Sequence, residues 1–298
     1  MAIETTLGPA SPARRLSSAL FRHPRLRLGL MLGPSLGWMV VVYLASLALL
    51  LVTAFWRLDV LTSRIVRDWG LGNFQELVDG EVYRTIVVRT VGMAAAVTVT
   101  DLLLAFPLAY FLARMATPRT RNLLLLSVLL PLWSNYLVRM FSWKILTAGN
   151  GPLERLLAVV GLRVDLAATN WAVWLTFSYL WLPFAVLPVY AALERVPLSL
   201  LEASSDLGAR GWTTFRRVIV PIVLPGLFAA SIFTFSLTLG DYITPIYVGK
   251  GFFIGNAIYN LVGLASNLPL AAAFASVPVL VMALYLWLAG RFGALEAL

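Results

Sequence analysis

The side chains that could bind a small polar solute are few, and they lie among apolar residues. Six of them fall in or next to strongly apolar segments: Arg89, Asp101, Trp133, Tyr136, Asp241 and Tyr242. A carboxylate such as Asp241 with aromatic faces beside it suits an organic cation, because charge attraction and cation–π attraction then act together. A turn or the end of a helix accounts for Asp241 equally well, so both interpretations stay open.

Two of these residues share one apolar segment. Arg89 and Asp101 are twelve residues apart, which is about 18 Å along a helix axis, so they do not pair with each other. Ionisable residues inside a membrane helix are candidates for a functional role. For Asp101, an ion pair with another residue and contact with a solute both remain possible. Arg89 and Arg139 would instead suit an anionic group.

Several kinds of catalytic site are excluded by composition. The chain has no cysteine, and its only histidine is His23, which removes thiolate chemistry and His-dependent metal sites and triads. A phosphate-binding P-loop needs Gly-x-x-x-x-Gly-Lys-Ser/Thr. The only Gly-Lys pair is at Gly249, and Gly251 follows it. We therefore expect no ATP hydrolysis and no cofactor in this chain.

The composition indicates an integral membrane protein. Of 298 residues, 60% are hydrophobic and 12% are charged, and the mean hydropathy is +0.85. Soluble proteins carry about 25% charged residues. The net charge of +9 comes from residues scattered between apolar segments, so we do not expect nucleic-acid binding. Six segments approach the roughly 20 apolar residues of a membrane helix, at 28–56, 85–113, 122–140, 171–193, 218–240 and 270–290.

Arginine placement predicts the orientation of these segments. Arginines gather in the tail 1–27 and in the loops 114–121 and 194–217, and such loops lie on the cytoplasmic side. Both termini are then cytoplasmic. We expect cytoplasmic tails at 1–27 and 292–298 and a single transmembrane domain at 28–291. A short interfacial helix is predicted between Gly151 and Gly161, with Pro at its start.

The loop 194–217 has the pattern of a short helix. Ser199 and Glu202 have the spacing of a capping box, and Gly208 can end a helix in the left-handed conformation. The residues between them repeat at the spacing of one helix face: Leu200, Ala203, Ser204 and Leu207. A helix of about eight residues is marginal alone in water. We therefore expect it to pack against its own domain or a partner.

This loop resembles the coupling loop of bacterial ABC importer permeases. The family pattern is Glu-Ala-Ala, three residues, Gly, nine residues and Ile-x-Leu-Pro; this chain has Glu202-Ala203-Ser204, Gly208 and Val218-Ile219-Val220-Pro221. The resemblance implies that the loop docks on a separate ATP-binding subunit. The residues it assigns to this role are Glu202, Ala203, Ser204, Asp206, Leu207, Gly208, Arg210, Phe215 and Pro221.

Further segments resemble the first-subunit type of the spermidine/putrescine permease subfamily. They lie at 106–114, 130–134, 137–139, 182–195, 240–245, 254–256 and 267–270. The resemblance implies an all-α integral membrane protein with six transmembrane helices and a cytoplasmic coupling helix, which is the type I ABC importer permease fold. It also implies polyamine uptake by alternating access across the bacterial inner membrane.

The same resemblance implies a set of partners. They are a dimer of ATP-binding subunits that holds the ATP and Mg, a second and non-identical permease subunit, an extracytoplasmic solute-binding protein and membrane lipid. Related permeases carry phosphonates, opines and other small solutes, so the substrate stays open. An ATP-independent secondary transporter or channel would leave the 202–208 helix without a role. A membrane enzyme would need a catalytic cluster that this sequence lacks.

Overall fold

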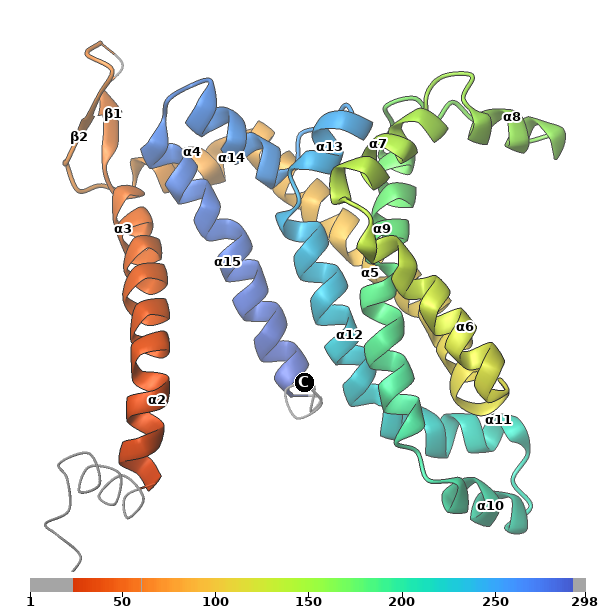
Figure 1. Cartoon of the computed structure of the whole chain (residues 1–298). Coiled ribbons are helices and arrows are strands. Elements are labelled where there is room, and N and C mark those ends of the chain that lie inside the picture. The colour runs from red at the N-terminus through yellow and green to blue at the C-terminus, as the bar shows by residue number, and fades with distance from the viewer. Residues whose placement is uncertain (1–23, 60, 292–298) are drawn as a thin grey trace, which may run out of the picture. The chain divides into compact units, whose positions relative to one another are not determined.

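The structure is a computed structural model that describes residues 24–59 and 61–291 (Figure 1). The predicted terminal tails lie largely outside these residues. The chain forms two compact units, Met1–Thr53 and Ala54–Leu298. In the first unit, the helical segments α2 (Pro24–Trp38), η1 (Met39–Leu44, a π-helix) and α3 (Ala45–Thr53) follow one another without interruption, which matches the first predicted apolar segment.

Three long helices pack together at the centre of the second unit (Figure 1). They are α5 (Glu81–Arg114), α9 (Asn170–Glu194) and α12 (Val220–Gly240). Small residues let these helices approach closely, as is common in membrane proteins. At Gly226 of α12, a Cβ atom would lie only 2.3 Å from the Cβ of Ala192 in α9. A further helix, α15 (Leu268–Gly290), packs against α12.

The third predicted apolar segment is not one straight helix, which corrects the prediction for 122–140. It consists of α6 (Pro118–Leu129), the 3-10 turn η2 (Leu130–Trp133) and α7 (Tyr136–Leu146). The two parts meet at 96°. Pro131 cannot donate a backbone hydrogen bond to a continuing helix. Asn135 starts the new helix, because its side chain accepts from the Leu137 N–H at 2.8 Å.

Short elements lie at the two ends of the second unit. One end carries the hairpin of β1 (Arg57–Asp59) and β2 (Arg64–Val66), with α4 (Gly72–Asp79), α8 (Pro152–Val159), α13 (Ile243–Val248) and α14 (Ile254–Gly263) (Figure 1). The other end carries α10 (Leu198–Asp206), α11 (Gly211–Thr214) and the π-helix η3 (Phe215–Ile219) (Figure 1). The antiparallel hairpin was not predicted, whereas α8 confirms the predicted short helix.

The helices account for the predicted membrane segments. Among the described residues, five helices are long and apolar enough to cross a membrane, or six if the bent pair α6–α7 counts as one span. The predicted helical membrane fold is confirmed, and the six predicted spans are reached when the bent pair is counted as one span.

Candidate functional site

The short helix predicted in the loop 194–217 is α10, and it begins earlier than the capping-box pattern requires. Pro197 is the residue at its N-cap position, and no side chain in the described structure caps it. The predicted capping box of Ser199 and Glu202 is therefore wrong, because Ser199 already lies inside the first turn. Glu202 is exposed to solvent. Its carboxylate is free to contact another molecule.

The end of α10 confirms the predicted role of Gly208. Its φ is +74°, a left-handed conformation that glycine adopts without steric cost. The Gly208 N–H donates to the Ser205 carbonyl at 2.8 Å, and the Ala209 N–H donates to the Ser204 carbonyl at 3.1 Å. This pair of bonds is a Schellman motif, which satisfies carbonyls that the helix end would otherwise leave unpaired.

Beside α10 lies a groove of about 670 Å³. It is lined by most of the residues assigned to docking, and by residues of α11 and η3. Leu207 in its lining is 87% exposed, and Trp212 of α11 is 70% exposed. Arg210 and Arg217 supply positive charge in the lining. Exposed apolar side chains with charged neighbours are typical of a protein-docking surface.

Three contacts hold α10 and its neighbours in place, and two of them reach the long helices. Leu201 of α10 packs on a buried cluster that includes Val189 of α9 and Val223 of α12. The hydroxyl groups of Ser204 and Thr214 lie 2.8 Å apart, which joins α10 to α11. Phe215 of η3 meets Phe106 of α5 edge to face, with ring centroids 5.5 Å apart. Through these contacts, the segment from α10 to η3 touches α5, α9 and α12.

Pro221 lies at the junction between η3 and α12. A proline has no N–H for the backbone hydrogen bond that an α-helix would place there, and the turns just before it are π-helical. The helical path nevertheless continues from Gly211 to Gly240. Pro221 thus changes the winding of the helix near its α10 end without breaking it.

At the opposite end of the unit, Asp241 directly follows α12 and lies two residues before the first residue of α13. Its Oδ1 accepts from the backbone N–H groups of Ile243 at 2.7 Å and Thr244 at 3.2 Å. Its Oδ2 accepts from the Tyr136 hydroxyl and, at 2.9 Å, from the Thr244 hydroxyl. The position therefore supports the helix-terminus interpretation of Asp241. Thr244 was not predicted, although it stands three residues after Asp241, where a capping oxygen finds its partner.

Tyr136 also belongs to an aromatic stack. Its ring lies nearly parallel to that of Trp181, with centroids 6.1 Å apart, and Trp181 stacks on Phe177 at 6.5 Å. Three buried nitrogen donors at this stack have no hydrogen-bond partner among the described residues. They are Nε and Nη1 of Arg139 and Nε1 of Trp181. Unpaired buried donors can bind an acceptor on a ligand or a partner.

The side chains of the other predicted solute-contact residues make no hydrogen bond or ring contact with Tyr136 or Asp241 in the described part of the chain. Tyr242 stacks on Tyr259 at 5.5 Å, and Arg89 donates to the Phe252 carbonyl at 3.4 Å. Trp133 is 85% exposed on η2. Asp101 is fully buried in α5, and neither of its carboxylate oxygens has a partner within the described chain. The ion pair considered for Asp101 is thus not formed there. Of the six candidates, the structure joins only Tyr136 and Asp241.

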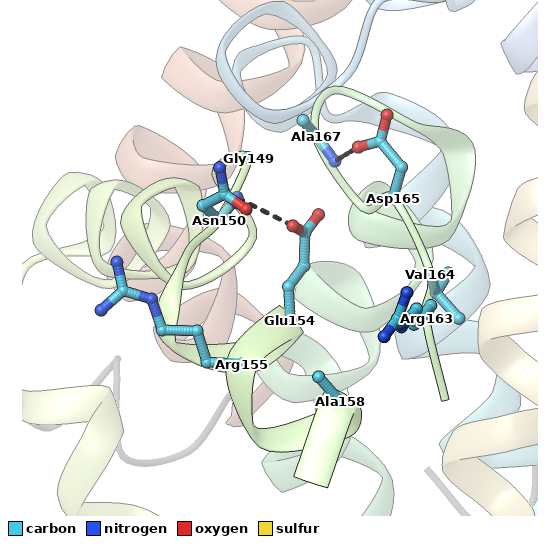
Figure 2. Close-up of a pocket in the computed structure, with 9 residues that line it drawn as sticks. All are labelled: Gly149, Asn150, Glu154, Arg155, Ala158, Arg163, Val164, Asp165 and Ala167. Carbon is cyan, nitrogen blue, oxygen red and sulfur yellow. Dashed lines mark hydrogen bonds between the residues drawn. The ribbon is translucent and has the colours of Figure 1, made fainter. Parts of the chain in front are cut away.

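A separate pocket of about 600 Å³ lies between α8 and the segment 163–167 (Figure 2). Glu154 bridges it, because its carboxylate accepts from the Asn150 N–H at 2.8 Å and the Leu166 N–H at 2.6 Å. Arg155 and Arg163 extend on opposite sides of Glu154 (Figure 2). Glu154 thus links the two ends of the connection between α7 and α9 by hydrogen bonds. None of the predicted solute-contact residues lines this pocket.

Comparisons with known proteins agree with this architecture. Residues 105–294 match the family model described as "Binding-protein-dependent transport system inner membrane component". The chain is 41% identical to the inner membrane ABC transporter permease protein YdcU of Escherichia coli (strain K12), over 100% of both chains. It is 32% identical to the spermidine/putrescine transport system permease protein PotB of the same strain, over 86% of this chain and 94% of PotB.

A solved structure shows the same fold. A chain of a bacterial alginate ABC transporter, in complex with an alginate pentasaccharide-bound periplasmic protein, superposes with a TM-score of 0.73 and 17% identity. The match covers 95% of this chain and 98% of that one. The predicted type I permease fold is therefore confirmed. By family model and by sequence identity, this chain belongs to the binding-protein-dependent transport system inner membrane components, the permeases of ABC importers.

Proposed function

We propose that this chain is the permease subunit of an ATP-driven polyamine importer and that α10 is its docking helix for a separate ATP-binding subunit. In this proposal a dimer of that subunit binds ATP and Mg and hydrolyses the ATP, and the chain itself catalyses nothing. Closure of the dimer moves α10, and the long helices then alternate between outward-open and inward-open arrangements.

The observation that carries the proposal is the way α10 is held. Its outer surface is exposed and borders a groove with two arginines, while its inner side is attached through Leu201 and the Ser204–Thr214 hydroxyl pair. A short helix that served only as a turn would need neither feature. An exposed surface on a firmly attached helix suits the transfer of movement from a partner into the membrane.

The remaining parts of the proposal concern orientation and partners. The end of the molecule with α10 faces the cytoplasm, as do both termini, and residues 28–291 form the permease domain. The end with α13 and α14 faces the extracytoplasmic solute-binding protein. A second, non-identical permease subunit completes the solute path. The arginine distribution supports the orientation, and the likeness to PotB supports the partner set.

A polyamine is the leading substrate. The likeness to PotB supports it, and so do the aromatic faces of Tyr136 and Trp181 next to the Asp241 carboxylate. One observation favours a second candidate, a small anionic solute such as a phosphonate or an opine. The unpaired nitrogens of Arg139 lie at the same cluster, and a guanidinium group binds phosphonate or carboxylate oxygens well.

Co-purification with the neighbouring gene products would test the proposal. The complex would be reconstituted in lipid, and ATP hydrolysis and uptake would be measured with and without the solute-binding protein. Stimulation by the spermidine-loaded binding protein is the expected result. If the complex forms but responds only to a phosphonate-loaded or opine-loaded binding protein, the proposed substrate changes from a polyamine to that anionic solute. A chain that purifies and transports alone, without ATP, would overturn the proposed function.

A further inference from the structure

Arg114, the last residue of α5, lies against the chain segment that leads into α10. Its Nη2 atom donates to two backbone carbonyls, those of Leu193 and Val196, each at 2.6 Å. Leu193 is in the last turn of α9, and Val196 precedes Pro197, the N-cap of α10. One half-buried guanidinium group therefore holds the ends of α5 and α9 and the start of α10 together.

The chemistry of this contact makes it strong and specific. The last carbonyls of a helix lack partners within the helix, and the negative end of the helix dipole favours a cation there. Hydrogen bonds from a charged donor are about twice as strong as those between neutral groups. Because Pro197 fixes its own φ, holding the Val196 carbonyl also restrains the direction in which α10 leaves α9.

We infer that Arg114 is a positioning residue that sets the orientation of α10 relative to α5, so that movement of α10 is converted into movement of the membrane helices. The inference rests on the proposed role of α10 as the docking helix. Arg114 does not line the groove beside α10. Its effect would be on the coupling of ATP hydrolysis to uptake, with binding of the ATP-binding subunit retained.

The contacts of the two nearby arginines in α6 differ from those of Arg114. Arg121 makes an exposed ion pair with Glu194 at 3.6 Å, and exposed pairs contribute little. Arg119 is exposed and makes no hydrogen bond or ion pair with any described residue. Arg119, in the first turn of α6, thus serves as a control with the same side chain five residues away.

The test compares Arg114→Ala, Arg114→Gln, Arg114→Lys and Arg119→Ala in the complete reconstituted complex. The readout is the number of ATP molecules hydrolysed per solute imported. We expect Arg114→Ala and Arg114→Gln to retain stimulated ATP hydrolysis but to raise this ratio about tenfold, because the charge-assisted bonds to both carbonyls are lost. Arg114→Lys keeps a charged donor and should give an intermediate ratio. Arg119→Ala should match the wild type.

A second readout reports geometry directly. Because the natural chain has no cysteine, spin labels can be placed at Ser205→Cys on α10 and Leu103→Cys on α5 without background labelling. We expect a narrow distance distribution with Arg114 and a broader one in the Ala and Gln variants. Wild-type ratios and distributions in the Gln and Lys variants would overturn the inference, even if the Ala variant did not assemble. Failure of the unmodified complex to couple ATP to uptake would instead overturn the proposed function.

Discussion

The ring of Phe215 meets the ring of Phe106 edge to face, with centroids 5.5 Å apart. The two residues are far apart in the sequence. Their contact joins η3, which follows α10 and α11, to the C-terminal half of α5. Such pairs contribute about 0.5–1.5 kcal/mol beyond the burial of their area. In a double-mutant cycle with Phe106→Leu and Phe215→Leu, we expect an interaction energy in this range, measured by unfolding in detergent. Additive single effects would show that the rings do not interact.

Gly226 sits at a close approach of α12 to α9, so we predict a clash that a second substitution relieves. A methyl group at position 226 would lie 2.3 Å from the Cβ of Ala192. Overpacking of this kind costs about 1–3 kcal/mol, so Gly226→Ala should lower the thermal midpoint of the permease. Adding Ala192→Gly removes the opposing methyl group and should restore most of the loss. A double variant no more stable than Gly226→Ala would contradict the close approach.

Substitutions at Gly208 should follow the cost of a left-handed backbone. A Cβ atom there would meet no atom within 4 Å, so the backbone conformation alone sets the penalty. Asn tolerates this conformation best, Ala costs about 1 kcal/mol, and β-branched Val costs more. We expect ATP-driven uptake to fall in the order Gly, Asn, Ala, Val. Equal uptake by the Asn and Val variants would argue against a role for the helix end.

Glu202 should affect binding of the ATP-binding subunit rather than the stability of α10, since its side chain is exposed and does not cap the helix. Glu202→Gln should weaken the complex by about fivefold or less, the usual size for an exposed charge. Glu202→Lys should weaken it further, and added salt should reduce the difference between the variants. Titration of the detergent-solubilised permease with the ATP-binding subunit would measure both effects. A lower helix content in either Glu202 variant would contradict this prediction, because it would show that Glu202 stabilises α10.

Asp241 offers a way to separate capping from charge. Asp241→Ala removes the oxygen that accepts from Ile243 and Thr244 and should cost about 0.5–2 kcal/mol of stability. Asp241→Asn keeps an oxygen for the Ile243 and Thr244 N–H groups but replaces Oδ2, which accepts from the Tyr136 and Thr244 hydroxyls, with an NH2 donor. Stability should therefore fall, but by less than in the Ala variant. Weaker uptake of an organic cation by this variant would support a place on the solute path. Unchanged uptake would leave capping as its role.

Local patterns were enough to predict most of the helices but not their contacts. A membrane helix must be apolar along its whole length, and the segments now seen as α5, α9, α12 and α15 could be recognised for that reason. The Ser-x-x-Glu spacing at Ser199 fits the interior of a helix as well as its start, so the pattern alone could not place the first turn. Pro197, one residue before α10, was the better signal.

Contacts between distant residues carry no local signal. Tyr136 and Asp241 are 105 positions apart, and Arg114 reaches carbonyls 79 and 82 positions away. The break after Trp133 was also missed, because Pro131 alone is compatible with either a kink or an end. The Asn135 cap shows that a new helix begins after the turn. That helix, α7, also packs against α13, a contact that the local sequence does not reveal.

The spans differ widely in length, which makes the surrounding lipid a variable in its own right. The 34 residues of α5 extend about 51 Å, well beyond a hydrocarbon layer of about 30 Å. The part of the third span before its bend, Pro118–Trp133, extends only about 24 Å. A bilayer adapts to a long span through tilt of the helix and to a short one through local thinning. Its acyl-chain length becomes a physical control on how easily the helices rearrange.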